Sequence, residues 1–183
     1  MGMERFRLSW KKIIKVNIAR EEPANKSNKN MATTFIDYKD KKGFYISESF
    51  MQLAIYYISE ELKKSQYTFV NKTELLDTLD SSIKGYDKGF LVLLWDEELE
   101  GTVDEQTMIL LLQNVKASLM NKGDMISLTE LKAIPTDDPD FERLYSRNPF
   151  PTSELIKIMD ALIQMLNGSW TSTNLYLDIN YRL

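Results

Sequence analysis

Residues 31–65 read MATTFIDYKDKKGFYISESFMQLAIYYISEELKKS, and this stretch predicts two strands followed by a helix. Residues 31–38 form the first predicted strand and residues 44–46 the second, with a turn over 40–43, so the pair predicts a β-hairpin. From residue 49 the spacing of apolar residues changes from two to three and four, which is typical of an amphipathic helix over 49–65. Strands that precede a long helix in this way favour an α+β fold.

The rest of the chain predicts further helices and strands on both sides of this stretch. The apolar spacing predicts helices over 72–84, 103–121 and 152–167, and strands over 6–18, 89–95 and 170–183. The segment 89–95 (GFLVLLW) is apolar on both faces, so we expect it in the centre of the sheet. Residues 125–132 favour a strand, and a short helix from Leu128 is the alternative.

Several helix ends carry recognisable signals. Ser49 with Gln52, and Thr102 with Glu105, have the spacing of a capping box, in which each side chain binds a free backbone N–H of the first turn. Gly85 follows the second predicted helix, where a glycine commonly ends a helix.

The order of these segments predicts a single α+β domain over residues 1–183. We expect a mixed or largely antiparallel sheet packed against about four helices. Two long loops, 19–30 and 134–151, interrupt this pattern. The second loop contains four prolines and has room for one helical turn after Pro139.

The chain contains no histidine and no cysteine. It therefore has no imidazole base, no thiolate nucleophile and none of the usual zinc or iron–sulfur ligands. Glycine-rich phosphate-binding motifs and the Gly-x-Ser-x-Gly nucleophile motif are missing as well. We predict no catalytic residue, no metal site and no cofactor. The missing cysteines and the lack of a long apolar run indicate a cytoplasmic protein that does not enter a membrane.

The charges are distributed unevenly along the chain. Residues 1–92 hold 16 basic and 12 acidic side chains, whereas residues 93–183 hold 7 basic and 15 acidic ones. This asymmetry favours a charged partner surface. The alternative is that folding mixes these charges on one surface.

An acidic run follows the predicted central strand. It comprises Asp96, Glu97, Glu98, Glu100, Asp104 and Glu105. Such carboxylates can hold Mg²⁺ or Mn²⁺, act as an acid/base pair, or form a negative surface that docks on a basic partner. The alternative is a solvated loop whose last two carboxylates favour the N-terminus of the following helix.

The proline-containing loop is the second candidate contact region. Its candidate residues are Asp137, Asp138, Asp140, Phe141, Arg143, Tyr145, Arg147 and Phe150. A calcium-binding EF-hand beginning at Asp138 fails, because Arg143 stands where glycine is required and Pro149 where glutamate is required. Aromatic residues and arginine dominate binding hot spots, so we predict partner contact here. The alternative is that Phe141 and Phe150 attach the loop to the core.

Basic residues gather near the start of the chain. They are Arg5, Arg7, Lys11, Lys12 and Lys15, followed by Lys39, Lys41 and Lys42. A nucleic-acid strip is one interpretation. The spacing of the first group fits better with lysines that protect an exposed strand edge from unwanted pairing, so nucleic-acid binding is disfavoured.

Together these features predict a non-enzymatic protein that binds another protein stoichiometrically and occludes it. The most concrete form is a bacterial immunity or inhibitor protein that neutralises a toxin, because an acidic surface suits a basic target such as a nuclease. We expect the contacts to come from the candidate residues of the proline-containing loop and from Asp96, Glu97, Glu98 and Glu100. One alternative is a carboxylate-dependent enzyme that uses Mg²⁺ or a Glu/Asp pair, and another is a scaffold or homo-oligomer subunit.

Overall fold

Helix α2 (Glu48–Leu62) occupies the centre of the fold, with twelve of its fifteen residues buried. The computed structural model describes residues 32–181. Strands β1 (Thr33–Tyr38) and β2 (Lys42–Ser47) precede α2 and form the antiparallel hairpin that the sequence predicts. The chain passes from β2 into α2 without a loop, so the position of the hairpin directly fixes the start of the central helix.

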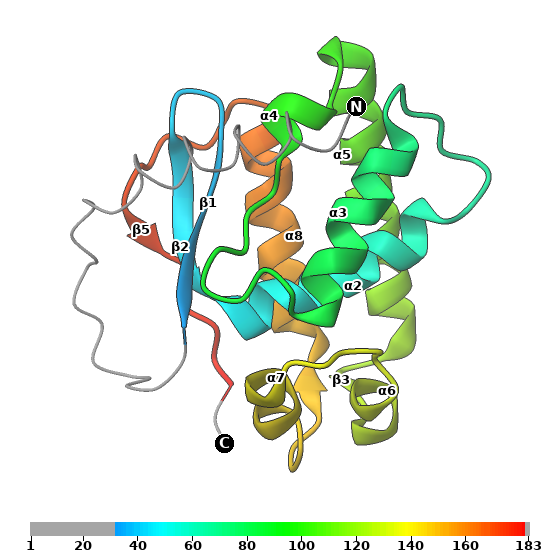
Figure 1. Ribbon diagram of the computed structural model, residues 1–183, viewed down its shortest axis with the longest axis vertical. Coiled ribbons are helices and arrows are strands. Elements are labelled where there is room, and N and C mark those ends of the chain that lie inside the picture. Colours follow the sequence, from blue (N-terminus) through cyan, green and yellow to red (C-terminus); the bar gives the residue numbers. More distant parts are fainter. Residues whose placement is uncertain (1–31, 182–183) are drawn as a thin grey trace, which may run out of the picture.

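Three further long helices surround α2. Helices α3 (Lys72–Lys84), α5 (Gly101–Lys122) and α8 (Thr152–Leu166) each contact it. Their inner faces are leucine-, isoleucine- and methionine-rich, and burying these side chains supplies the main favourable free energy of the fold. Figure 1 shows these helices on one side of the hairpin.

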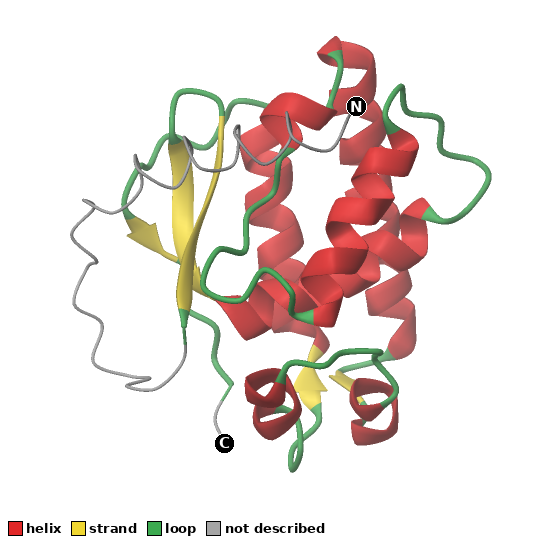
Figure 2. Cartoon of the chain, in the orientation of Figure 1, coloured by secondary structure: helices red, strands yellow, loops and turns green. Residues whose placement is uncertain are grey.

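The strands form two small sheets. The first has the order β1-β2-β5, in which β5 (Leu175–Tyr176) pairs parallel to β2. The second pairs β3 (Met125–Ile126) antiparallel to β4 (Phe150–Pro151). Figure 2 shows the second sheet at the end of the molecule that carries the short helices. Close packing in the hairpin requires Gly43, because a Cβ there would lie 2.0 Å from the carbonyl oxygen of Ile36.

The predicted fold class is confirmed. The described residues combine a small mixed sheet with four long helices in one α+β arrangement. The predicted helix ends at Gly85 and after residue 121 are also confirmed, since α3 and α5 end at Lys84 and Lys122. None of the helices among residues 32–181 combines the length and the apolar character needed to cross a membrane.

The predicted central strand over 89–95 is wrong. Residues 90–94 have no regular secondary structure and form no backbone ladder, and residues 95–98 form helix α4 (Trp95–Glu98). The segment runs beside β1, where side chains make the contacts: the Thr34 hydroxyl donates to the carbonyl of Leu91, and Asp96 accepts from the backbone N–H of Lys39. Leu91, Leu93 and Trp95 are buried but Phe90 is exposed, so the apolar run indicated burial for only part of the segment. Burial also does not require backbone pairing.

The predicted strand over 170–183 is wrong apart from Leu175–Tyr176. Elsewhere, side chains attach this segment to the core. The Trp170 indole N–H donates to the carbonyl of Gly43 at 3.0 Å, and the Tyr181 hydroxyl donates to the carbonyl of Asn148 at 2.7 Å. Burial alternates only near the end of this segment, where Ile179 and Tyr181 are buried and alternate with exposed residues, while Thr171, Thr173 and Leu175 are exposed.

The short helix that stood as the alternative for 125–132 is present. After the two residues of β3, Ser127 begins helix α6 (Leu128–Lys132). Ser127 and Glu130 form a full capping box, in which the serine oxygen accepts from the Glu130 N–H and the glutamate accepts from the Ser127 N–H. This reciprocal cap stabilises a helix that is only five residues long.

The two predicted capping boxes are wrong. Helix α2 begins before Ser49, and Gln52 donates instead to a carbonyl in the last turns of α3 at 2.9 Å. Helix α5 begins before Thr102, and Glu105 accepts from the hydroxyl of Tyr38 at 2.9 Å. Both side chains make tertiary contacts that a local spacing rule does not include.

The segment 134–151 contains the helical turn that the sequence allowed after Pro139. It forms α7 (Pro139–Leu144), capped by the Asp138 carboxylate, which accepts from the backbone N–H of Asp140 at 2.9 Å. The predicted strand over 6–18 and the predicted loop over 19–30 lie outside the described residues, as do the basic residues of the first group.

Candidate protein interface

The first and last residues of the acidic run bind the β1–β2 hairpin near its turn. Asp96 accepts from the backbone N–H of Lys39 at 3.1 Å. Glu105 accepts from the Lys39 ammonium group and from the Tyr38 hydroxyl. The hydrogen bond from Lys39 is the main reason that the pKa of Glu105 lies below its usual value. These carboxylates tie the hairpin to α4 and α5, so part of the acidic run has a structural role.

Two other members of the acidic run are buried. Asp104 accepts from the backbone N–H of Glu100 at 3.1 Å, which satisfies a free donor at the start of α5. Glu98 accepts from the hydroxyl of Thr78 on α3 at 2.5 Å. Burial raises the pKa of Glu98 to about 7, the Thr78 hydrogen bond opposes this rise, and the nearby negative charges of Glu97 and Glu74 add to it.

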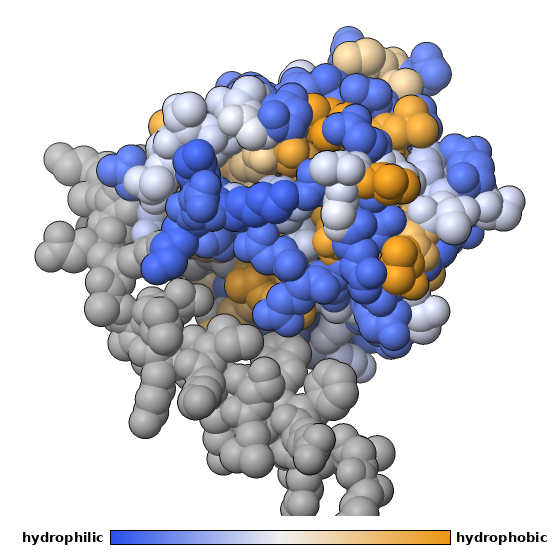
Figure 3. Space-filling view, turned by 90° about the horizontal axis from the view of Figure 1, so that it is seen from above, coloured by the Kyte–Doolittle hydropathy of each residue, from blue (hydrophilic) through white to orange (hydrophobic). Residues whose placement is uncertain are grey.

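The exposed members of the acidic run are Asp96, Glu97 and Glu100. These three predicted contact residues are accessible to a partner, whereas Glu98 is not. The end of the molecule that carries α4 is largely hydrophilic in Figure 3. Among residues 32–181, no group of three or more acidic side chains is close enough to hold a metal ion.

The aromatic residues predicted for partner contact in 137–150 are buried. Tyr145 packs edge-on against Phe141 and Phe150, with ring centroids 4.6 and 5.7 Å apart. Phe150 also contacts Phe50 on α2 and Tyr181 near the end of the chain, at 5.9 and 5.0 Å. A buried ring cannot contact a partner, so the interface prediction is wrong for these three residues. They attach the segment to the core, which was the alternative interpretation.

The charged residues of the same segment have different positions. Asp137, Arg143 and Arg147 are exposed, so they stay within the predicted interface. Asp138 is buried as the cap of α7, and Asp140 is half-buried. The Arg143 guanidinium binds the Asp140 carboxylate at 2.9 Å. The accessible part of this segment is therefore charged rather than aromatic.

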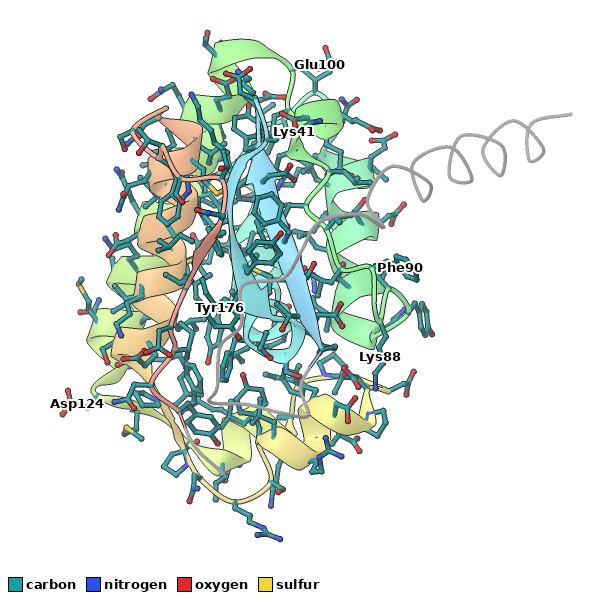
Figure 4. All side chains as sticks on the ribbon, turned by 90° about the vertical axis from the view of Figure 1, so that its left-hand side faces the viewer. Lys41, Lys88, Phe90, Glu100, Asp124 and Tyr176 are labelled. Carbon is teal, nitrogen blue, oxygen red and sulfur yellow. The ribbon has the colours of Figure 1, made fainter. Side chains whose placement is uncertain are left out.

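Exposed aromatic residues lie on a neighbouring loop that sequence reasoning missed. We call residues 85–90 (GYDKGF), which follow α3, the aromatic loop. Tyr86 and Phe90 are 68% and 66% exposed. Figure 4 shows Phe90 directed away from the body of the molecule, on the same side as Lys88. The sequence predicts Phe90 to lie in a central strand and therefore to be buried, and this prediction is wrong.

Contacts with three helices, α3, α7 and α2, hold the aromatic loop in place. Asp87 accepts from the hydroxyl of Ser82 at the end of α3 at 3.0 Å. Lys88 binds two carboxylates of α7 and its cap, and its distance to Asp138 is 3.3 Å. The backbone N–H of Gly89 donates to Glu48 at the start of α2 at 3.0 Å. These bonds fix a loop whose aromatic side chains bury little surface within the chain.

Gly85 allows α3 and α7 to approach closely. It has φ +82°, in the left-handed region that glycine adopts without strain. A Cβ at this position would lie 2.8 Å from the Cβ of Asp138. In addition, the backbone N–H of Asp137 donates to the carbonyl of Lys84 at 3.1 Å. The base of the aromatic loop and the start of α7 therefore form one interlocked unit.

The electrostatics of this unit follow from its ion pairs and burial. The hydrogen bond from Lys88 holds the pKa of Asp140 below its usual value, and the same bond raises the pKa of Lys88. Burial raises the pKa of Glu48, and the nearby negative charge of Asp138 adds to the rise, while hydrogen bonds from Gly89 and Leu91 lower it. Glu48 is thus a buried carboxylate whose main contacts hold the aromatic loop.

A small pocket lies beside the same segment. It has a volume of about 190 Å³ and is lined by Leu131, Lys132, Ile134, Thr136, Phe141, Glu142, Tyr145 and Ser146. Sites for drug-sized ligands usually occupy roughly 300–1,000 Å³, so this pocket suits only a small group.

The candidate interface consists of the aromatic loop and the exposed charges of the neighbouring α7 segment, whereas the exposed carboxylates near α4 lie toward the opposite end of the molecule from α7 (Figure 1). A single sequence signal could have indicated the aromatic loop: two aromatics within five residues, each directly after a glycine that interrupts regular structure. Comparisons with protein-family models, curated proteins and solved structures found no match to this chain.

Proposed function

We propose that this protein binds another protein stoichiometrically through the aromatic loop and occludes it. The observation that carries the proposal is that Tyr86 and Phe90 are two-thirds exposed on a loop that hydrogen bonds of Glu48, Lys88 and Asp87 attach to the fold. Pre-organised aromatic side chains make strong contacts, because little conformational entropy is lost when they are buried.

The charge of the described region supports a basic partner. Residues 32–181 contain 14 lysines and arginines against 24 aspartates and glutamates. Exposed Asp96, Glu97 and Glu100 add negative charge near α4. A negative surface speeds the approach of a positive partner and raises selectivity. The most concrete form of the proposal is a cytoplasmic immunity protein that neutralises a basic toxin such as a nuclease.

Bacterial survival tests this form. The product of the gene next to this one would be expressed alone, with the wild-type protein, or with the double variant Tyr86→Ser/Phe90→Ser. We expect the wild type to restore growth and the double variant to lose at least about tenfold in protection, since two hot-spot rings are removed. The control is Leu175→Ser, which removes an exposed apolar side chain on β5 and should protect like the wild type.

Calorimetry with the purified pair gives the second readout. We expect a 1:1 complex whose affinity falls as salt is added, because charge attraction is screened over about 10 Å at 0.1 M salt. Equal survival with and without this protein would overturn the immunity form. Full protection by the double variant would overturn the role of the aromatic loop.

A carboxylate-dependent enzyme is the second candidate, and one observation favours it. The pKa of Glu98 is raised to about 7, which is the range of a general acid or base. The same side chain is buried and accepts from Thr78, so its structural role explains the position without catalysis. Calorimetric titration with Mg²⁺, comparing wild type with Glu98→Gln, tests this candidate: a loss of measurable binding in the variant would support it.

A further inference from the structure

The outer face of α5 is uncharged over five turns. It consists of Val103, Gln106, Leu110, Gln113, Ala117 and Met120, all exposed, which we call the α5 outer face. Three of these are large apolar side chains with exposed fractions of 73%, 52% and 62% for Val103, Leu110 and Met120. The opposite face of the same helix is buried against the rest of the fold. A surface helix usually buries an apolar face and exposes a charged one. Helix α5 instead exposes a face that is uncharged and partly apolar.

The spacing along this face is that of a helix-packing seam. Its residues follow one another at intervals of three, four, three, four and three. This is the alternation of a heptad repeat, in which one stripe of a helix faces a second helix along its whole length. The exposed positions of α3 and α8 differ, since they include Glu74 and Asp77 on α3 and Lys157 on α8. Among the long helices, α5 thus presents a solvent-exposed stripe that lacks the charges found on its neighbours.

We propose that two copies of this chain associate through the α5 outer face, with the two helices antiparallel. The distribution of charge indicates that the partner on this face is a second copy of the chain. A basic partner gains nothing from an uncharged stripe, whereas two copies of an acidic chain repel each other except where charge is missing. The stripe offers each copy a contact without like-charge repulsion.

The antiparallel direction follows from the two ends of the helix. Exposed Glu100 precedes the first turn of α5, and Lys122 ends the last turn. Lys122 already pairs with Glu130 of its own chain, so the direction rests on the helix dipoles, which oppose each other favourably in an antiparallel pair. Under two-fold symmetry Val103 lies opposite Met120, and Leu110 lies opposite Gln113, so no apolar residue faces a charge.

The size of the contact predicts a weak dimer. Residues 103–120 span about 27 Å of helix. A single helix pair of this length lies at or below the roughly 1,200 Å² at which stable interfaces begin. We therefore expect dissociation constants of the order of micromolar or weaker.

Sedimentation equilibrium of the full chain, from roughly 1 µM to 1 mM, tests the association. We expect a monomer–dimer equilibrium for the wild type and at least a tenfold weaker one for Leu110→Lys, which puts two charges into the seam. Leu175→Lys is the matched control, because Leu175 is an apolar residue of similar exposure on β5, and it should dimerise like the wild type. A wild type that is monomeric throughout, or a Leu110→Lys variant that dimerises normally, would overturn the proposal.

Disulfide trapping tests the direction, and the absence of native cysteine makes it specific. The double variant Val103→Cys/Met120→Cys should form a covalent dimer on mild oxidation, whereas Val103→Cys alone should not. Efficient cross-linking of the single variant would show a parallel pair and overturn the antiparallel arrangement. Thermal unfolding of each variant checks that it is folded.

Discussion

The aromatic loop and the segment 137–150 are neighbours joined by Lys88, yet their aromatic residues differ in solvent exposure. Tyr86 and Phe90 are exposed, while Phe141, Tyr145 and Phe150 are buried against α2 and the end of the chain. Both segments are short, rich in charge and interrupted by glycine or proline. The difference shows that residue type alone does not separate a contact residue from a core residue, because the partner of each ring comes from elsewhere in the chain.

The largest expected effect separates the two sets of rings. Phe150→Ala should lower the free energy of unfolding by about 3–5 kcal/mol, because it leaves a cavity between Phe50, Tyr145 and Tyr181. Phe90→Ala should change it by no more than about 0.5 kcal/mol, since the ring buries little surface. Urea unfolding measures both. Similar losses for the two variants would break the comparison, because the rings would then have equivalent environments.

The second prediction concerns the close contact that joins the two segments. Gly85→Ala should destabilise the protein by roughly 2–4 kcal/mol, through the left-handed backbone and the overlap with Asp138. Gly89→Ala is the matched control: it has the same φ of +82° but open space around its Cβ, so only the backbone cost of about 1–2 kcal/mol applies. Thermal unfolding compares the two. Equal losses would show that the approach to Asp138 contributes nothing.

The third prediction uses pH to distinguish the acidic run from the ion pairs below the aromatic loop. The pKa of Glu98 is about 7 in the folded protein, above the usual 4.5. The folded state therefore binds this proton more tightly, and stability decreases as pH rises from about 4.5 to 7. Asp140 behaves oppositely: its lowered pKa adds stability above its usual value of 3.8, and this is lost as pH falls.

Glu98→Gln tests the sign. The neutral amide still accepts from Thr78, so the variant should match the wild type near pH 4 and exceed it by about 1–2 kcal/mol at pH 8. Asp140→Asn should lose stability above pH 4 instead. Unfolding by urea at both pH values measures the differences. A Glu98→Gln variant that is less stable at pH 8 would contradict the assignment.

The smallest expected effect on stability belongs to Lys88, which connects the two segments. Lys88→Met should change the free energy of unfolding by less than about 1 kcal/mol, because the ammonium group is partly exposed and its ion pairs are screened by water. The loop should nonetheless open more often, and the amide of Gly89 should exchange its hydrogen faster. Hydrogen exchange checks this, with an amide in the centre of α2 as the internal control. Unchanged exchange at Gly89 would show that Glu48 and Asp87 hold the loop without Lys88.

Much of the secondary structure could be predicted from the sequence, because helix periodicity is a local property. The four long helices, the hairpin and the helical turn after Pro139 lie close to their predicted ranges. Local rules failed where a side chain had a distant partner. Gln52 and Glu105 have capping-box spacing but bind α3 and β1, and the apolar run 89–95 contacts β1 through the Thr34 side chain instead of a backbone ladder.

For the candidate site too, some features follow from the sequence and others only from the tertiary structure. The sequence by itself determined the missing histidine and cysteine chemistry, the excess of acidic residues in the second half and the α+β class, since these depend on composition and spacing. Only the tertiary structure decided which carboxylates are paired and which rings are exposed. Burial of a ring or a charge depends on what packs against it, and for Phe150, Lys88 and Glu98 those partners lie on other elements of the fold.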